Sequence, residues 1–247
     1  MKKMTLKFVS LAAILATSSL ALADDGVIRG RAGLSRNDFT SLYSGGPLKS
    51  TYNSLNLGVT YIQTTGWYYD LALKNSLSAK WELTGERNPA DVAFDIGSGN
   101  DSYKRNDTTL TIGKALDGGI QVFGGYQRAN STMDLGPNTG NYLEKFNVNG
   151  LFVGAGKTIP MSVGSINING AIGQMKGKLL AANSQWYTSD TGTGFSLGLS
   201  YSYPLSDKST LSLEYKRQAY KYEFTSGPST GGDDKLQSIG ANISYQF

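Results

Sequence analysis

The sequence predicts an all-β fold, a closed antiparallel transmembrane β-barrel of about ten strands behind a cleaved signal peptide. Three observations predict it. Apolar and small polar residues alternate along one segment after another, short and long connections alternate between those segments, and the chain opens with a secretory leader.

The leader has the order of a signal peptide. Three lysines among the first seven residues form a basic start, residues 8–22 are apolar apart from small hydroxyl residues, and positions 21–23 offer an Ala-Leu-Ala cleavage site. The apolar run is shorter than the roughly 20 residues that a membrane-spanning helix needs. We therefore expect residues 1–23 to be removed and residues 24–247 to form one barrel domain.

The composition argues against several classes of function. The net charge of +4 includes three lysines of the leader, so the mature chain is nearly neutral and lacks the clustered basic residues of a nucleic-acid binder. Without cysteine there is no disulfide framework, and without histidine the chain lacks the usual general base and the commonest metal ligand. We expect no enzymatic activity, no catalytic residue, no metal, no cofactor and no nucleic-acid partner.

The alternation has the two-residue period of a strand. From Phe195 to Tyr203 one face carries Phe, Leu and Tyr, and the other carries only Ser and Gly. Ten segments show this pattern: 26–35, 52–62, 66–76, 105–115, 118–129, 145–157, 164–176, 194–205, 208–220 and 236–247. The sixth fits least well, because Asn147 and Asn149 share the phase of Leu151, and a bulge near Gly150 would restore the pattern.

Short and long connections alternate along the chain. Short turns are expected at 64–66, 116–118, near Pro160 and at 206–208, and long polar loops at 36–51, 77–104, 130–144, 177–193 and 221–235. A membrane barrel has this asymmetry between its two ends. In hydrocarbon every backbone polar group must be paired, so the first strand must bond the last. A secreted β-sandwich is the competing fold, although it does not need every second loop to be short.

The last strand carries a recognisable pattern. Ile239, Ala241, Ile243, Tyr245 and Phe247 alternate down to the terminal phenylalanine. This resembles the closing strand of Gram-negative outer-membrane β-barrel proteins, whose final aromatic pattern is read by the barrel-assembly machinery. The resemblance implies export through the periplasm to the cell outer membrane and contact with outer-membrane lipid and lipopolysaccharide. It also implies that Tyr245 and Phe247 form the assembly signal.

The resemblance names the superfamily and no family within it, and it leaves the oligomeric state open. Outer-membrane proteases and lipid-modifying barrels are similar to this chain only as barrels, because each of those enzymes uses a histidine.

The inward phase of the strands predicts a charged lumen. The proposed lumen charges are Arg29, Arg31, Asp70, Lys74, Arg105, Asp107, Glu214 and Lys216. They could form the constriction of a narrow passive, porin-like channel for small hydrophilic solutes, which is our leading expectation. They could also pair and seal the interior. The protein would then be a non-conducting surface protein whose extracellular loops bind a ligand, a host molecule or an envelope partner.

Overall fold

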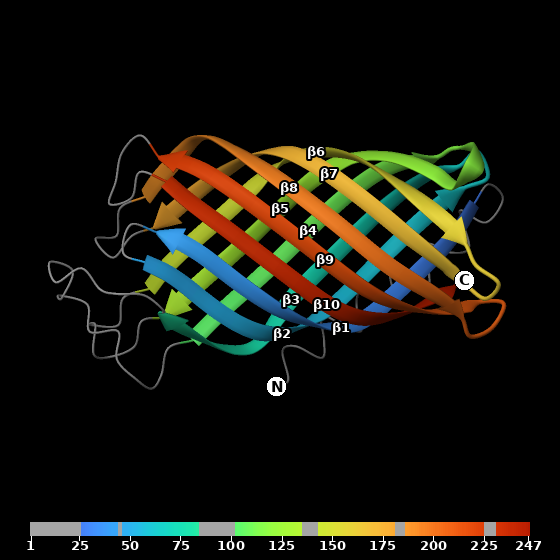
Figure 1. The fold of residues 1–247 in the computed structure, drawn as a ribbon, viewed down its shortest axis with the longest axis horizontal. Coiled ribbons are helices and arrows are strands. Elements are labelled where there is room, and N and C mark those ends of the chain that lie inside the picture. The colour runs from blue at the N-terminus through green and yellow to red at the C-terminus, as the bar shows by residue number, and fades with distance from the viewer. Residues whose placement is uncertain (1–25, 44–45, 84–101, 135–142, 181–185, 225–230) are drawn as a thin grey trace, which may run out of the picture.

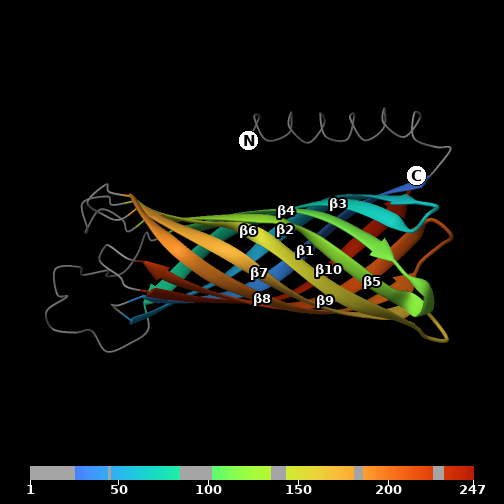
Figure 2. The ribbon, with the colours of Figure 1, turned by 90° about the horizontal axis from the view of Figure 1, so that it is seen from above.

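The protein forms a single closed sheet of ten antiparallel strands (Figures 1 and 2). The structure is a computed structural model that describes residues 26–43, 46–83, 102–134, 143–180, 186–224 and 231–247. The predicted leader lies outside these residues. The strands are β1 (Gly26–Tyr43), β2 (Gly46–Gln63), β3 (Trp67–Leu83), β4 (Ser102–Ala115), β5 (Ile120–Asp134), β6 (Leu143–Pro160), β7 (Ser165–Leu180), β8 (Trp186–Pro204), β9 (Ser209–Phe224) and β10 (Gly231–Gln246).

The ring closes between the two ends of the chain. β1 pairs with β10 from Arg29 opposite Gln246 to Leu42 opposite Asp233, and the Phe247 amide donates a hydrogen bond to the Ile28 carbonyl at 3.0 Å. Each strand therefore has two hydrogen-bonded neighbours and the sheet has no free edge. This confirms the predicted ten-stranded barrel over the sandwich. No helix within the described ranges is long and apolar enough to cross a membrane.

Short turns gather at one end of the barrel, which we call the turn end (Figure 1). They fall at residues 64–66, at the 3-10 turn η2 (Asp117–Gly119), at 161–164 and at 205–208, as the sequence predicts. Gly66 and Gly164 have φ values of 86° and 79°, which a side chain would strain. The opposite end is the loop end, where the connections fall largely on residues outside those described.

The strands are strongly tilted against the barrel axis. A row of hydrogen-bonded partners that starts at Asp233 on β10 runs through Leu151 on β6 and Gly30 on β1, and returns to β10 at Tyr245. After one circuit of the barrel, the row has thus moved along β10 from near its loop end to near its turn end. Such stagger is what allows a sheet to close into a barrel.

The strands are longer than predicted at the loop end. β1 continues to Tyr43 and β2 begins at Gly46, so most of the loop expected at 36–51 is strand. Likewise β9 runs to Phe224 and β10 begins at Gly231 within the loop expected at 221–235. The other three expected loops also lose residues to strands, and what remains of them lies outside the described residues.

The extra strand length has a physical cause, which is a reversal of polarity along each strand. Toward the turn end, large apolar side chains point outward and are exposed, forming an apolar belt. Its members are Leu34, Trp67, Tyr69, Leu110, Ile112, Val122, Tyr126, Leu151, Val153, Ile168, Ile172, Phe195, Leu197, Leu199, Tyr201, Leu213, Tyr215, Ile239, Ile243 and Tyr245. Beyond the belt, in what we call the outer section, the outward residues are largely polar and the inward ones are buried, with large aromatic and aliphatic side chains among them.

The ninth strand shows the reversal clearly. Leu213 and Tyr215 point outward and are exposed, whereas further along Arg217 and Lys221 take the outward positions and Tyr220 turns inward and is buried. In the belt the surroundings are hydrocarbon, so apolar residues face out. In the outer section the surroundings are water, so apolar residues face in.

The same reversal corrects the prediction for the sixth strand. β6 keeps an unbroken register with both neighbours around Gly150, so the bulge expected there is absent. Asn147 and Asn149 point outward because they lie in the outer section, while Phe146 and Val148, which alternate with them, are buried inside. Polar residues in the outward phase thus mark the end of the belt and leave the strand intact.

Candidate functional site

The lumen at the turn end holds a polar cavity of about 520 Å³, which we call the vestibule. It reaches the turns at Gly66 and Ala115. Its polar lining consists of Arg31, Thr60, Tyr68, Asp70, Thr111, Gln121, Asn167, Asn169, Ser200, Glu214 and Lys216. Four of the predicted lumen charges, two of each sign, therefore face one cavity.

An ion pair lies in the wall of the vestibule. Arg31 on β1 donates two hydrogen bonds to the carboxylate of Asp70 on β3, with Nη2 2.9 Å from Oδ2. Thr60 on β2, between them, accepts a hydrogen bond from Arg31 Nη1 at 3.1 Å and donates one to Asp70 Oδ1 at 2.6 Å. Gly58 leaves room for the guanidinium, because a Cβ there would lie 2.5 Å from Arg31 Cζ. The contacts tie three neighbouring strands together.

The other predicted charges have different surroundings. Glu214 and Lys216 line the vestibule from β9, and Lys74 on β3 donates a hydrogen bond from Nζ to Ser238 Oγ on β10 at 2.9 Å. Arg29 is opposite Thr60 and Gln246 in the register. Within the described residues it forms no ion pair with the carboxylates that Arg31 faces.

A smaller chamber of about 140 Å³ continues from the vestibule and shares Thr111, Phe123, Asn169 and Lys216 with it. A crossbar of three side chains stands at its far side. Gln218 on β9 donates to Gln127 on β5 at 3.3 Å, and Gln127 donates to the Tyr220 hydroxyl at 3.0 Å. Since β5 and β9 are far apart in the ring, these bonds span the lumen.

Beyond the crossbar the lumen is filled by buried side chains, which we call the plug. Its members are Phe39, Tyr52, Tyr103, Ala129, Phe146, Val148, Met175, Leu179, Tyr220, Tyr222, Phe224 and Leu236, each at most 6% exposed. Phe146 meets Tyr222 edge to face at 5.4 Å, and Phe39 stacks on Tyr103 at 5.6 Å. The plug is packed from opposite walls like the core of a soluble protein.

An ion pair is embedded in the plug. Arg105 is 2% exposed, and its Nε donates a hydrogen bond to Asp107 Oδ1 on the same strand at 2.9 Å. Its guanidinium carbon also lies 5.2 Å from the centre of the Phe39 ring. These two charges point inward as expected, yet they lie among apolar side chains and do not line the vestibule.

A carboxyl group is also buried in the outer section. Asp234 on β10 is 1% exposed and accepts a hydrogen bond from Ser41 Oγ on β1. This part of β10 lies beyond the belt. Burial raises the pKa of the Asp234 carboxyl to about 6, and the bond from Ser41 acts in the opposite direction. The folded outer section therefore gains stability as the pH falls through about 6 toward the ordinary pKa of aspartate.

The sequence-based reasoning missed the plug. A signal for it was present, because Phe39, Tyr103 and Tyr222 continue the alternation beyond the predicted strand ends. Their phase is opposite to that of the belt residues, which is why the rule for lipid-facing strands predicts loops there. Within the described ranges no group of three or more carboxylates could hold a metal ion.

We expect the Arg31–Asp70 pair to act as a unit. The substitution Arg31→Met should lower the free energy of unfolding by about 1–2 kcal/mol, because it leaves the Asp70 carboxylate in a confined site with Thr60 alone. This loss of stability is smaller than for a deeply buried ion pair, because the Arg31 and Asp70 side chains are 29% and 15% exposed. Adding Asp70→Leu should restore most of the loss. Urea unfolding in micelles measures both, with Arg29→Met as control. A loss equal to that of the control would contradict the pairing.

Comparison with known proteins concerns the fold. No protein-family model matches the sequence, and no curated protein sequence does. Among solved structures, the translocator domain of the autotransporter NalP from Neisseria meningitidis is 14% identical, with a TM-score of 0.46 and coverage of 100% of this chain and 98% of that one. OprG from Pseudomonas aeruginosa is 12% identical, with a TM-score of 0.40 and coverage of 90% and 96%.

Neisserial surface protein A is 10% identical, with a TM-score of 0.40 and coverage of 89% and 97%. Likeness at this level carries no argument about activity or ligand. The architecture follows from the chain's own closed ring of strands and its outward apolar belt. By these two features the chain is a small β-barrel of the outer-membrane type.

Proposed function

We propose that the protein is a sealed outer-membrane barrel that acts at the cell surface through its outer section and loops, without conducting solutes in its resting state. The plug carries this proposal. A pathway for small hydrophilic solutes needs a continuous open path with a polar lining, whereas the lumen beyond the crossbar is filled by nearly unexposed side chains, the aromatic and aliphatic plug residues together with the Arg105–Asp107 pair. Of the two functions that the sequence suggests, the geometry supports the surface protein better.

The proposal includes an orientation. The belt lies in the outer membrane, the turn end faces the periplasm, and the outer section projects from the cell, in line with the usual place of short turns in such barrels. We further propose that the leader is cleaved, that the barrel-assembly machinery inserts the chain, and that Tyr245 and Phe247 serve as its signal. Both rings are exposed on the barrel wall and meet edge to face at 5.3 Å.

A channel remains the second candidate, and the vestibule favours it. The cavity offers charges of both signs and room for a small solute, so displacement of the plug would complete a polar path. We propose no catalytic activity, since no histidine is present to activate the serines.

Recordings in planar bilayers test the proposal. We expect the refolded wild-type protein to give no conductance steps at neutral pH, because the plug leaves no continuous water path. An open general porin refolded and inserted by the same procedure serves as positive control, and heat-modifiable mobility on a gel shows that the barrel is folded. Regular, ion-selective steps from the wild-type barrel would contradict the sealed state and favour the channel.

A further inference from the structure

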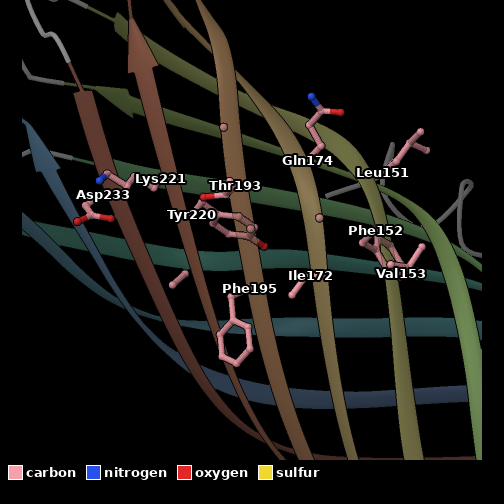
Figure 3. A pocket seen from close by; sticks show the side chains of 14 residues that line it. Leu151, Phe152, Val153, Ile172, Gln174, Thr193, Phe195, Tyr220, Lys221 and Asp233 are labelled. Atoms are coloured by element: carbon pink, nitrogen blue, oxygen red, sulfur yellow. The ribbon is translucent and has the colours of Figure 1, made fainter.

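The outer wall of the barrel carries a groove of about 770 Å³ at the loop-end edge of the belt. Its apolar part consists of Leu151, Val153, Ile172, Phe195 and Ala219 on four neighbouring strands. Toward the loop end the lining becomes polar. Figure 3 shows Ile172 and Phe195 in the apolar part and Lys221 and Asp233 at the polar end.

The groove has a simple sequence origin. Gly173, Gly192 and Gly194 contribute backbone to its floor, and the outward positions between the large side chains hold only Thr193 and Ala219. Around this hollow, Leu151, Val153 and Ile172 are 68%, 62% and 63% exposed, among the most exposed apolar side chains of the described chain. The groove is therefore a built depression within a surface that lipid covers.

The lining of the groove changes from apolar to polar in the same order in which a lipid changes from acyl chains to headgroup. Val153, Ile172 and Phe195 lie within the belt, at the level of acyl chains. Gln174, Thr193 and Lys221 are the next outward positions toward the loop end after Ile172, Phe195 and Ala219 on β7, β8 and β9, and their register row rises away from the belt residue Leu151. A lipid lying along the groove would place its chains against the first set and its headgroup against the second.

The charges at the polar end favour an anionic headgroup. Lys221 lines the groove, and Lys176 is two residues beyond Gln174 on the same face of β7; both are exposed. Asp233, paired with Lys221 across β9 and β10, is the acidic member of the lining.

More cations surround the outer section, and we call this set the basic collar. The collar consists of Arg36, Lys49, Lys104, Arg128, Lys145, Lys176, Lys178, Arg217, Lys221 and Lys235, against Asp38, Glu223 and Asp233 as the outward acidic residues among those described. Basic residues at this level attract anionic lipid headgroups.

We propose that this groove binds a phosphorylated glycolipid of the outer leaflet, with acyl chains on Ile172 and Phe195 and a phosphate at Lys176 and Lys221. The proposal relies on the orientation given above, since the groove must face the outer leaflet. It is independent of whether the lumen conducts. A bound glycolipid would make this wall of the barrel, over β6–β9, its preferred contact with the leaflet.

Native mass spectrometry of the purified full-length barrel in neutral detergent tests the site, with lipid A as the probe. We expect wild type to retain lipid A. The variant Lys176→Glu/Lys221→Glu should bind it roughly tenfold more weakly or worse, since each reversal replaces an attraction by a repulsion. Lys49→Glu/Lys104→Glu is the matched control, because it also reverses two outward collar cations, on β2 and β4 away from the groove. Ala219→Trp, which fills the groove without changing charge, should weaken binding as well.

Several outcomes would overturn the proposal. Equal weakening by Lys49→Glu/Lys104→Glu would show diffuse attraction to the collar. Unchanged binding by Ala219→Trp would show that the acyl chains do not lie in the groove. Equal retention of phosphatidylglycerol would exclude selection of a glycolipid. Heat-modifiable mobility of each variant confirms that it is folded, and Lys176→Gln/Lys221→Gln replaces the reversal if that variant does not fold. Conductance of the wild type would overturn only the sealed state, so the two failures are distinguishable.

Discussion

We expect that removing two tyrosine rings from the plug gives a conducting barrel, whereas the proposed sealed wild type gives no conductance steps. Tyr220 and Tyr222 point inward from β9, with ring centroids 6.4 Å apart and planes inclined by 21°. Tyr220 is also the last side chain of the crossbar, which closes the smaller chamber next to the vestibule. In Tyr220→Ala/Tyr222→Ala, water can extend from the chamber toward the loop end, so single-channel recording should show steps that the wild type lacks.

The chain offers a closely matched control for this experiment. Tyr61 and Tyr69 form a similar pair on the outside of the barrel, with centroids 6.3 Å apart and planes inclined by 22°. Tyr61→Ala/Tyr69→Ala removes the same atoms from the lipid-facing side and should remain silent. The plug variant should also lose about 3–5 kcal/mol of stability for each buried ring. A folded plug variant that stays silent would show that the remaining side chains suffice to close the lumen.

We expect that placing one methyl group at Gly33 prevents the ring of strands from closing between β1 and β10. Gly33 lies on β1 opposite Asn242 of β10, and a Cβ there would be 2.1 Å from Asn242 Oδ1 and 2.2 Å from the Ala241 carbonyl oxygen. In Gly33→Ala the two strands must separate locally, in the one pairing that joins the first strand to the last. We expect the folded, heat-modifiable form to be lost or much reduced on a gel, together with its protease resistance.

The control for this prediction is another glycine within a strand. At Gly170 on β7 an added Cβ would meet Leu197 Cδ2 at 3.5 Å, an ordinary contact. Gly170→Ala should therefore keep the heat-modifiable form. Equal amounts of the heat-modifiable form in the two variants would mean that the pairing of β1 with β10 can accommodate a side chain at Gly33, contrary to this prediction.

The sequence predicted the ten strands because every second side chain of a lipid-facing strand must be apolar. Each strand start near the turn end was found within a few residues, since there the outward face must be apolar and turns such as Asp117-Gly118 are short. Inward positions such as Arg31 and Asp70 followed from the same phase. That phase allowed either Arg29 or Arg31 to meet Asp70 or Glu214, and the observed pairing of Arg31 with Asp70 is one of these possibilities. The choice depends on the register of three strands, which alternation alone leaves open.

The loop end could not be predicted by that rule. Beyond the belt, residues such as Arg36 and Asp38 are polar and outward, which resembles a loop when a lipid-facing strand is expected. The inward residues Asn37 and Phe39 are buried, but only Phe39 is apolar, so the pattern on β1 is weak. On β9 the inward Tyr220, Tyr222 and Phe224 alternate with outward Lys221 and Glu223, so the exchange of polarity itself indicates the extra strand length and the plug.

The exchange of polarity also determines the depth at which the barrel sits. Displacement toward the periplasm would draw Arg36, Arg128 and Arg217 into hydrocarbon, where charged side chains are costly. Displacement outward would bring belt residues such as Leu151 and Ile239 into water. Both movements raise the free energy, so the immersion of the barrel has one minimum. The outward charges of the outer section keep the boundary between hydrocarbon and water at one level of the strands, and the plug fills the lumen beyond that level. A bilayer of different thickness would therefore have to deform around the protein.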